Sequence, residues 1–385
     1  MNIKDFGAGL KGIIQNMAKK TGELASSAGE TIRDKAAQSA GHPRMKIRIC
    51  MLGARGVGKT SIITSMYNSM SEAVTNTGLF LSASMDTQII LNSKLHDLNS
   101  IYQGHPAKGD LIAESGIEGD ASESVFEFTY GFNKEKINID LEIRDYPGEY
   151  LKDRPDTVAD FIREASAVLI AIDTPCLMEE GGRYQAAKNR LDLVSEFLIK
   201  HMDSESEKLL LLVPLKCEKY CLEGRIDEVT DRVKKYYGGL IEHFRDREDR
   251  FNFKKKVCCA ITPIQTLGTV AFHDFGRDAN GEVIEIMGND GMALPREQRY
   301  EYAVAGAQYR PRNCEQPLYY LLSFISKQYS REIEAKKTSG IIGRLMKSFS
   351  LVPKVEEFFI EIQTLASKRI DSGQGYKILY GKGRI

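Results

Sequence analysis

The chain has 385 residues, of which 42% are hydrophobic and 28% are charged, and its formal net charge is zero. That length suits one large domain with extensions, or two domains. The longest apolar runs, 167–172 and 209–214, are far shorter than the roughly 20 residues that span a bilayer. The first residues also lack the apolar core of a secretion signal. We therefore expect a cytoplasmic globular protein.

Charge is distributed unevenly along the chain. Residues 1–44 carry seven Lys/Arg against four Asp/Glu, residues 331–385 carry eleven against six, and residues 45–330 carry 35 against 43. Because the body is acidic, we expect no nucleic-acid partner.

Both ends of the chain have amphipathic patterns. Apolar residues in 1–44 recur at three- and four-residue steps, which predicts an N-terminal helical extension weakened by five glycines. Such a helix would dock on the protein's own core or stay partly disordered; alternatively, it would be a reversible arm for a membrane or a partner. Residues 338–385 are predicted to be a basic amphipathic C-terminal extension. Contact of these ends with a membrane would make the protein peripheral.

Between the ends, strand-like apolar runs alternate with helical patterns. Strands are predicted at 46–53, 124–132, 136–145, 165–173, 208–215 and 254–262, and helices at 60–70, 180–202, 226–248 and 314–337. This alternation predicts an α/β fold with a mainly parallel sheet covered by helices on both faces.

Two segments interrupt the predicted domain, which spans residues 45–337. Residues 71–123 are long and polar and are predicted to form a mobile loop. Residues 269–309 contain two strand-like runs around Asn280-Gly281, which predict a hairpin insertion.

A phosphate-binding motif follows the first predicted strand. The pattern G-x-x-x-x-G-K-[ST] is complete, and its residues together with the next one are Gly53, Ala54, Arg55, Gly56, Val57, Gly58, Lys59, Thr60 and Ser61. Glycines let backbone N–H groups turn toward phosphate oxygens, the lysine adds positive charge at the β- and γ-phosphates, and the threonine hydroxyl ligates Mg²⁺. The helix that follows points its positive dipole end at the anion. The motif therefore predicts a nucleotide-binding P-loop.

A second motif, Asp145-Tyr-Pro-Gly148, comes at the end of the third predicted strand. A carboxylate at Asp145 would hold Mg²⁺ through water, since hard cations prefer oxygen ligands. Gly148 would present its backbone N–H to a γ-phosphate without a side chain in the way.

Together the two motifs resemble the P-loop GTPases of the TRAFAC class, which have a Ras-like core. The body, about 45–330, is most similar to the bacterial double-GTPase family, through the phrases "RDYPGEYL", "VLIAIDTP" and "VPLKCEKY". The resemblance implies Mg²⁺ and GTP as cofactors and a regulatory role with a protein partner or activating protein. This chain has one P-loop, so the family's name does not imply two sites here.

The resemblance also implies a base-reading motif of the form [N/T]-K-x-D, at the place of Leu215-Lys216-Cys217-Glu218. Lys216 would lie against the purine and ribose, and Glu218 would accept hydrogen bonds from guanine. Because leucine and glutamate depart from that pattern, adenine stays open as the alternative base. A weaker match to the last base-side loop is Ala260-Ile-Thr262-Pro263.

Glu149 lies where related enzymes often place a glutamine that orients the attacking water. A carboxylate beside a γ-phosphate is repelled unless its charge is offset, so slow hydrolysis is expected, with Lys59, Gly148 and Glu149 as the catalytic set. Arg55 would point to solvent, reach the γ-phosphate region, or block a partner from inserting an arginine finger there. Further charge would come from Arg154 or Arg163, and the loop residue that closes on Mg²⁺ would be Ser115, Ser122 or Ser124.

These features predict a Mg²⁺-dependent GTP-binding switch with slow hydrolysis. Two alternatives stay open: an ATPase or other P-loop phosphotransferase, and a nucleotide-bound interaction module without catalysis.

Overall fold

The computed structural model describes residues 44–385 apart from 76–78, 104–105, 114–122, 133–136, 203–206, 251–256, 289, 335–354 and 368–375. The predicted N-terminal extension therefore lies outside the described residues, except for Arg44.

A central sheet of eight strands organises the fold, in the order β13-β8-β7-β6-β1-β5-β4-β2. These strands are β1 (Arg44–Leu52), β2 (Leu79–Ala83), β4 (Ser124–Phe132), β5 (Ile137–Asp145), β6 (Ala167–Asp173), β7 (Lys208–Leu215), β8 (Val257–Ile261) and β13 (Lys377–Tyr380). β1, β6, β7 and β8 pair in parallel, whereas β4 pairs antiparallel with both β5 and β2, and β13 pairs antiparallel with β8. The parallel part of the sheet confirms the predicted fold class.

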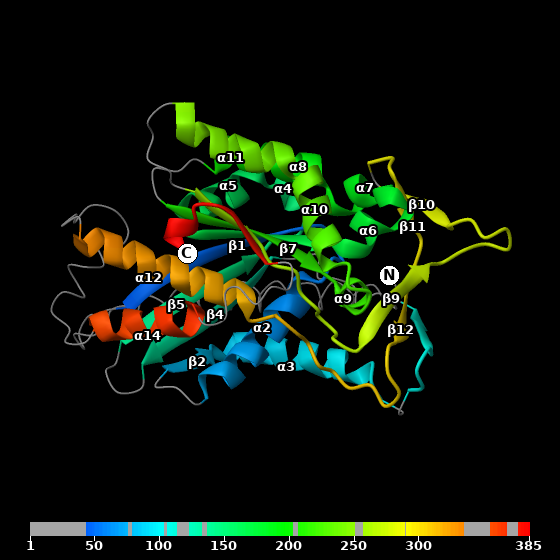
Figure 1. The fold of residues 1–385 in the computed structure, drawn as a ribbon, viewed down its shortest axis with the longest axis horizontal. Helices are drawn as coiled ribbons and strands as arrows, with labels where there is room; N and C mark the ends of the chain where they lie inside the picture. The colour runs from blue at the N-terminus through cyan, green and yellow to red at the C-terminus, as the bar shows by residue number, and fades with distance from the viewer. Residues whose placement is uncertain are drawn as a thin grey trace, which may run out of the picture. The chain divides into compact units, whose positions relative to one another are not determined.

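Helices cover both faces of this sheet (Figure 1). One face carries α2 (Lys59–Val74), α3 (Met85–Ser100), α12 (Gln316–Glu334) and α14 (Val355–Ser367). The other carries α4 (Tyr150–Asp153), α5 (Pro155–Glu164), α8 (Leu191–His201), α10 (Ile226–Tyr236) and α11 (Gly238–Arg250). Shorter elements connect them: α6 (Thr174–Met178), α7 (Gln185–Asn189), α9 (Glu218–Leu222) and the 3₁₀ turns η1 (Glu179–Gly182) and η2 (Lys382–Arg384).

The leucine run of β7 shows why the central strands are continuously apolar. Leu209 and Leu211 pack into the core on the α2 side, while Leu210 and Leu212 pack into the core on the α5 side. Successive side chains of a strand point to opposite faces, so a strand buried on both faces has no polar alternation.

Residues 71–123 are more ordered than the predicted mobile loop. α2 continues to Val74, and then β2, α3 and β3 (Leu111–Ala113) follow, while 114–122 lie outside the described residues. The Ser84 hydroxyl caps α3 by accepting a hydrogen bond from the N–H of Thr87 at 3.4 Å. α3 buries few apolar side chains, chiefly Leu91 and Leu98, and this narrow stripe explains why the sequence reads as a loop.

The predicted helix over 180–202 is also divided. α7 and α8 are separated by Arg190, whose backbone is left-handed with φ 47°. Similarly, the helix predicted over 226–248 divides at Tyr237 into α10 and α11.

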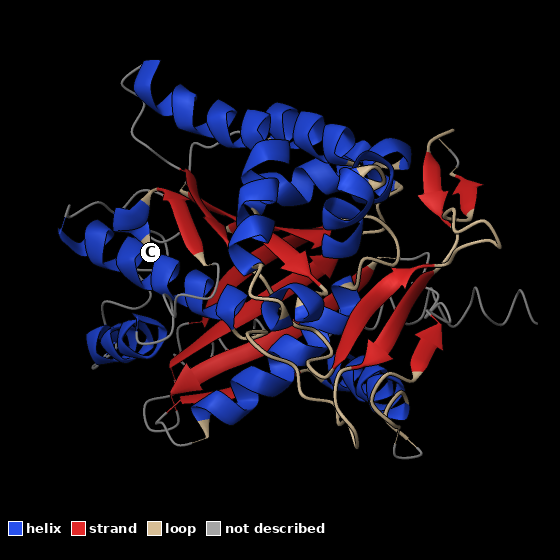
Figure 2. Cartoon of the chain, turned by 45° about the vertical axis from the view of Figure 1, so that its right-hand side comes forward, coloured by secondary structure: helices blue, strands red, loops and turns tan. Residues whose placement is uncertain are grey.

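The predicted insertion at 269–309 contributes to a separate three-stranded sheet, ordered β3-β12-β9, with β9 (Val270–Phe275) and β12 (Gln298–Tyr302). β10 (Glu285–Met287) pairs with β11 (Ala293–Pro295) beside it (Figure 2). The Asn280-Gly281 signal does make a tight turn, in which the N–H of Gly281 donates to the carbonyl of Asp278 at 3.1 Å. That turn is flanked by a single bridge, and β9 pairs with β12 instead. The hairpin prediction therefore located the turn correctly and paired the wrong strand.

Part of the predicted C-terminal extension belongs to the core of the compact unit Met45–Ile385. β13 adds an edge strand beside β8. α14 packs on α12, where the rings of Phe359 and Tyr329 stack with centroids 4.0 Å apart. The Ser326 hydroxyl also donates to the carbonyl of Phe359 at 2.8 Å.

Candidate functional site

The P-loop connects the end of β1 to the start of α2, and three of its glycines have positive φ: 151° at Gly53, 72° at Gly56 and 105° at Gly58. A Cβ on Gly53 would lie 2.9 Å from the carbonyl oxygen of Ala171 in β6. The loop therefore needs glycine both for its backbone conformation and for its close approach to the sheet.

Lys59 is folded over the P-loop. Its ammonium group donates to the carbonyl oxygens of Gly53 at 3.0 Å and Ala54 at 3.2 Å, and it lies 3.6 Å from Asp145 Oδ1. The side chain is only 9% exposed. The positive charge of Lys59 is thus held in place at the loop.

Asp145 and Thr60 lie together at the ends of neighbouring elements. The Thr60 hydroxyl donates to Asp145 Oδ2 at 3.2 Å, and the N–H of Tyr146 donates to the carbonyl of Met51 at 3.4 Å, which brings the end of β5 to the end of β1. Burial raises the pKa of Asp145, and the nearby Lys59 ammonium and Thr60 hydroxyl offset this only in part.

The Thr60–Asp145 pair fits a hard cation. Asp145 Oδ1 is buried and accepts no hydrogen bond from the part of the chain that the structure describes. A hydroxyl and a carboxylate with a spare buried oxygen form an oxygen donor set of the kind that Mg²⁺ prefers. These two predicted metal ligands are brought together by the structure.

Gly148 brings the loop after β5 against the P-loop. A Cβ at Gly148 would lie 3.2 Å from both Ala54 Cα and the Gly53 carbonyl oxygen. Glu149, the next residue, is exposed at the start of α4. The predicted γ-phosphate residue thus lies beside the loop, while the side chain of Glu149 extends into solvent.

The three arginines that were predicted as sources of positive charge near the phosphates are exposed or paired with other side chains. Arg55 is exposed on the P-loop. The Arg154 guanidinium stacks on the Tyr150 ring, 4.9 Å from its centroid, and Arg163 forms an ion pair with Asp160. These two guanidinium contacts are thus with residues of helices α4 and α5.

Lys216 follows β7 in a left-handed backbone conformation with φ 61°. Its ammonium donates to Asp173 Oδ2 at 2.9 Å and to Gln298 Oε1 at 3.1 Å. Asp173 is fully buried, which opposes ionisation, yet the ammonium groups of Lys216 and Lys188 lower its pKa to about 2. The two residues therefore form a buried ion pair at the sheet edge where β6 and β7 end.

Glu218 holds a neighbouring loop. Its Oε1 accepts hydrogen bonds from the N–H groups of Leu267 at 2.6 Å and Gly268 at 3.1 Å, and burial raises its pKa. One carboxylate oxygen of the predicted base-reading residue is thus used to position the loop after β8. The weaker base-side match, Ala260 to Pro263, is buried at the end of β8, where the N–H of Thr262 donates to the Leu212 carbonyl at 3.0 Å.

Of the three candidate loop serines, Ser115 and Ser122 lie outside the described residues. Ser124 begins β4 directly opposite Asp145 of β5 in the antiparallel register. Side chains opposite one another in such a pair share a face of the sheet, so Ser124 lies beside the predicted metal ligand.

Sequence reasoning missed four residues of this region. Asp173, Gln298 and Tyr300 surround Lys216, and Lys188 Nζ lies 3.4 Å from where a Cβ on Gly56 would be. Asp173 offered one signal, because it is the charged residue that ends the apolar run of β6. Gln298 offered none, since its charged partners Lys216 and Asp173 are 82 and 125 positions away.

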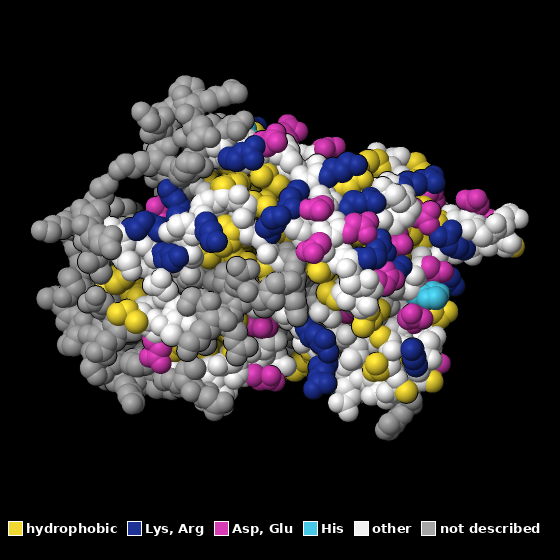
Figure 3. All heavy atoms as spheres, in the orientation of Figure 1, with side chains coloured by type: hydrophobic (Ala, Val, Ile, Leu, Met, Phe, Trp, Pro, Cys, Tyr) yellow, Lys and Arg dark blue, Asp and Glu magenta, His cyan; other side chains and the backbone are white. Residues whose placement is uncertain are grey.

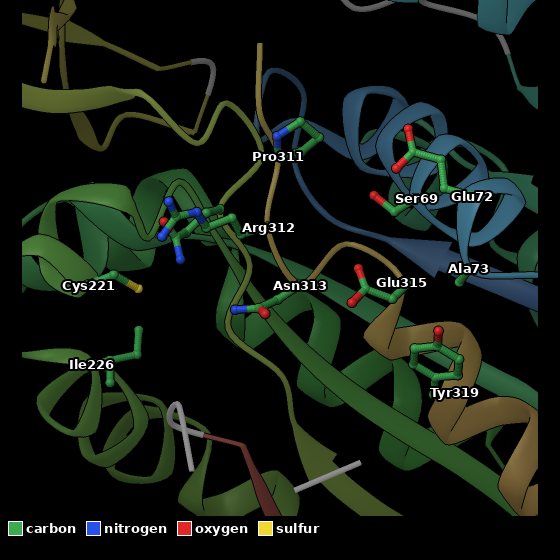
Figure 4. A pocket seen from close by; sticks show the side chains of 11 residues that line it. Ser69, Glu72, Ala73, Cys221, Ile226, Pro311, Arg312, Asn313, Glu315 and Tyr319 are labelled. Atoms are coloured by element: carbon green, nitrogen blue, oxygen red, sulfur yellow. The ribbon is translucent and has the colours of Figure 1, made fainter. Parts of the chain in front are cut away.

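A pocket of about 680 Å³ lies apart from the P-loop (Figure 4). Its walls come from α2, α9, the start of α10, the loop after β8 and the segment that enters α12. Glu72, Arg312 and Glu315 supply its charges. No P-loop residue is among those that line it, so this pocket is distinct from the candidate nucleotide site.

Within the described ranges, no helix combines the length and the apolar composition needed to cross a membrane.

The model of one protein family, described as Double-GTPase 2, matches residues 47–256, which is more than half of the chain. A comparison with curated proteins gives no match.

Among solved structures, the chain is similar to the Saccharomyces cerevisiae Ski7 GTPase-like domain bound to GTP, with 13% identity and a TM-score of 0.32 over 61% of this chain and 46% of that one. It is also similar to LeoA, a bacterial dynamin GTPase from ETEC, with 15% identity and a TM-score of 0.29 over 57% of this chain and 30% of that one. The matches therefore span less than half the length of either structure.

Proposed function

This chain belongs to the Double-GTPase 2 family and is a GTP-binding protein; we propose that it binds GTP with Mg²⁺, hydrolyses it slowly and acts as a regulatory switch. The observation that carries this proposal is the convergence of Lys59, Thr60 and Asp145 at the ends of β1 and β5. A strand, a glycine loop and a helix N-terminus, with a cation and two oxygen ligands beside them, are the parts that a phosphate–metal site needs.

Thr60 and Asp145 are the proposed Mg²⁺ ligands, and Lys59 is the proposed phosphate-binding cation. Ala54 to Ser61 would present backbone N–H groups to the phosphates. When bound, Mg²⁺ would neutralise part of the charge on the β- and γ-phosphates. Binding would also give Asp145 Oδ1, which accepts no hydrogen bond from the described residues, a second cation beside Lys59.

For the base, we propose that the stem of Lys216 lies against the purine and that Glu218 accepts from guanine through the oxygen that does not bind the loop at Leu267 and Gly268. The ion pair of Lys216 with Asp173 leaves the lysine methylenes as the surface offered to the ring.

The proposed switch is the loop from Asp145 to Glu149. Its contact with the P-loop at Gly148 supports a direct response to the γ-phosphate, whose presence would order the loop and whose loss would release it. A protein partner or activating protein would read that change. On the face seen in Figure 3, described Lys and Arg side chains are interspersed with Asp and Glu, which supports a protein partner over a nucleic acid.

Replacement of the P-loop lysine tests the nucleotide site. Lys59→Ala should reduce the affinity for GDP and GTP by at least about a hundredfold, because it removes a positioned cation from the phosphates. Calorimetric titration measures this, with Lys200→Ala on the exposed side of α8 as the matched control. If Lys59→Ala, shown to be folded by its thermal melt, kept the nucleotide affinity, the P-loop assignment would be wrong.

Single-turnover phosphate release tests hydrolysis. We expect slow release by the wild type, and release several times faster by Glu149→Gln, because the amide removes the repulsion between a carboxylate and the γ-phosphate. Tight GTP binding with no release by either protein would instead support a non-catalytic interaction module.

A further inference from the structure

Side chains from three separate parts of the chain meet around Lys216. Asp173 ends β6 and Lys216 follows β7. Gln298 and Tyr300 come from β12 of the three-stranded sheet β3-β12-β9, which is called the small sheet below. Gln298 is 3% exposed and Asp173 is fully buried, so this network is almost entirely shielded from water.

Each polar atom of the Gln298 side chain has a partner in the network. Its Oε1 accepts from Lys216 at 3.1 Å and from the Tyr300 hydroxyl at 2.5 Å, while its Nε2 donates to the two Asp173 oxygens at 3.3 and 3.2 Å.

The glutamine amide supplies an acceptor for Lys216 and a donor for Asp173 at the same time. A carboxylate at position 298 would repel Asp173, and an apolar side chain would remove the oxygen that accepts from Lys216 and from the Tyr300 hydroxyl. Gln298 therefore links the Lys216 ammonium to the Asp173 carboxylate in addition to their direct contact.

The network restrains a side chain that is otherwise highly flexible. A lysine has four rotatable side-chain bonds, and fixing them on ligand binding costs free energy. Here the Lys216 ammonium is already held by Asp173 and Gln298 and lies 5.7 Å from the centroid of the Tyr300 ring. Lys216 is thus ordered before any ligand arrives.

We propose that Gln298, supported by Tyr300, is a positioning residue of the nucleotide site: it holds the Lys216 side chain in the conformation that packs against the base and ribose. The inference rests on the proposed function, which places Lys216 against the purine. In this proposal the small sheet contributes to the nucleotide site, because β12 supplies the side chain that orders Lys216.

The test compares ligands that do and do not reach Lys216. Gln298→Leu should weaken binding of GDP about tenfold, since a hydrogen bond to a charged group is lost, while binding of inorganic tripolyphosphate at the P-loop stays within about twofold of wild type. A change that merely loosened the fold would weaken both ligands together. Tyr300→Phe removes one donor to Gln298 and should weaken GDP binding by a smaller factor.

Arg299→Ala is the matched control on the same strand, because Arg299 pairs with Asp274 of β9 instead of with the network. It should leave GDP binding unchanged. If Gln298→Leu does not fold, Gln298→Asn replaces it: the shorter amide cannot reach both Lys216 and Asp173, so GDP affinity should still fall selectively.

Lys216→Ala distinguishes the proposed base-packing role of Lys216 from the proposed positioning role of Gln298. If Lys216→Ala leaves GDP affinity unchanged, the proposed role of Lys216 fails and this inference fails with it. If Lys216→Ala weakens GDP binding but folded Gln298→Leu binds GDP within twofold of wild type, or loses GDP and tripolyphosphate binding equally, only the positioning role of Gln298 is overturned.

Discussion

Gly148 lies where the backbones of the two nucleotide motifs approach each other closely. The atoms that a Cβ would approach, at 3.2 Å, both belong to the backbone of the P-loop, at Ala54 and Gly53. Backbone atoms cannot swing aside as the end of a flexible side chain can, so any side chain at position 148 must push the two loops apart.

Gly148→Ala should therefore weaken GTP binding several times more than GDP binding, because the displaced loop is the one proposed to contact the γ-phosphate. Titration of both nucleotides measures the ratio. Gly239→Ala is the control, since among the described residues no heavy atom beyond its chain neighbours and its own helical backbone lies within 4 Å of the position its Cβ would take. Equal weakening of GTP and GDP by Gly148→Ala would argue against a γ-phosphate contact there.

At the residue scale, local motifs were predictable and distant partners were not. Lys59, Thr60 and Asp145 were predicted from spacing, and the structure brings them together. Glu218 was predicted to read the base, and one of its oxygens holds the loop after β8. Gln298 could not be predicted, because its contacts depend on how the small sheet packs.

At the scale of elements, β13 completes the sheet at one edge. Gly381, just after it, has φ 75°, and a Cβ there would lie 2.9 Å from Cys258 Cα in β8. The close approach of these two backbones requires a glycine.

Gly381→Val should lower the free energy of unfolding by about 1–3 kcal/mol, through the positive φ and the clash with β8. Gly383→Val tests the same terminal segment at a position where no described residue beyond the adjacent backbone has a heavy atom within 4 Å of the added Cβ, and it should be close to neutral. Urea unfolding monitored by circular dichroism compares them. Equal stability of the two variants would show that β13 does not depend on this contact.

Long buried strands were predicted well because continuous apolar runs mark them in the sequence. β6 and β7 differ from prediction by at most two residues at their starts. β13 has four residues, and α3 buries a narrow apolar stripe. Neither pattern is strong enough to distinguish an element packed on the core from a loop or an extension.

For the unit Met45–Ile385 as a whole, the buried Asp173–Lys216 ion pair gives stability a specific pH dependence. The folded-state pKa of Asp173 is lowered from 3.8 to about 2. A carboxylate whose pKa is depressed by folding stabilises the folded state above its unfolded pKa, and this contribution is lost as pH falls through the folded value.

Asp173→Asn should therefore cost on the order of 2 kcal/mol of unfolding free energy at pH 6. Because the wild type loses the same contribution in acid, the difference between the two proteins should shrink as pH falls from 4 toward 2. Urea titrations across that range measure it. A difference that stays constant with pH would mean that Asp173 does not titrate with a depressed pKa.

At this scale, the sheet covered on both faces was predictable from the alternation of buried strands and amphipathic helices. The packing of the small sheet against the site was not, because it is made by contacts such as that between Gln298 in β12 and Lys216 after β7, with 3.1 Å between Oε1 and the ammonium nitrogen. Such pairs are far apart in the sequence and have no common periodicity.

The most direct test of the account is the nucleotide preference of the purified chain in the presence of Mg²⁺, measured by calorimetric titration with GDP and ADP after removal of any copurified nucleotide. Lys216 and Glu218 at the proposed base site predict that GDP binds at least about tenfold more tightly than ADP. Equal or tighter binding of ADP would contradict the guanine assignment, and the absence of binding by either nucleotide would contradict the nucleotide site itself.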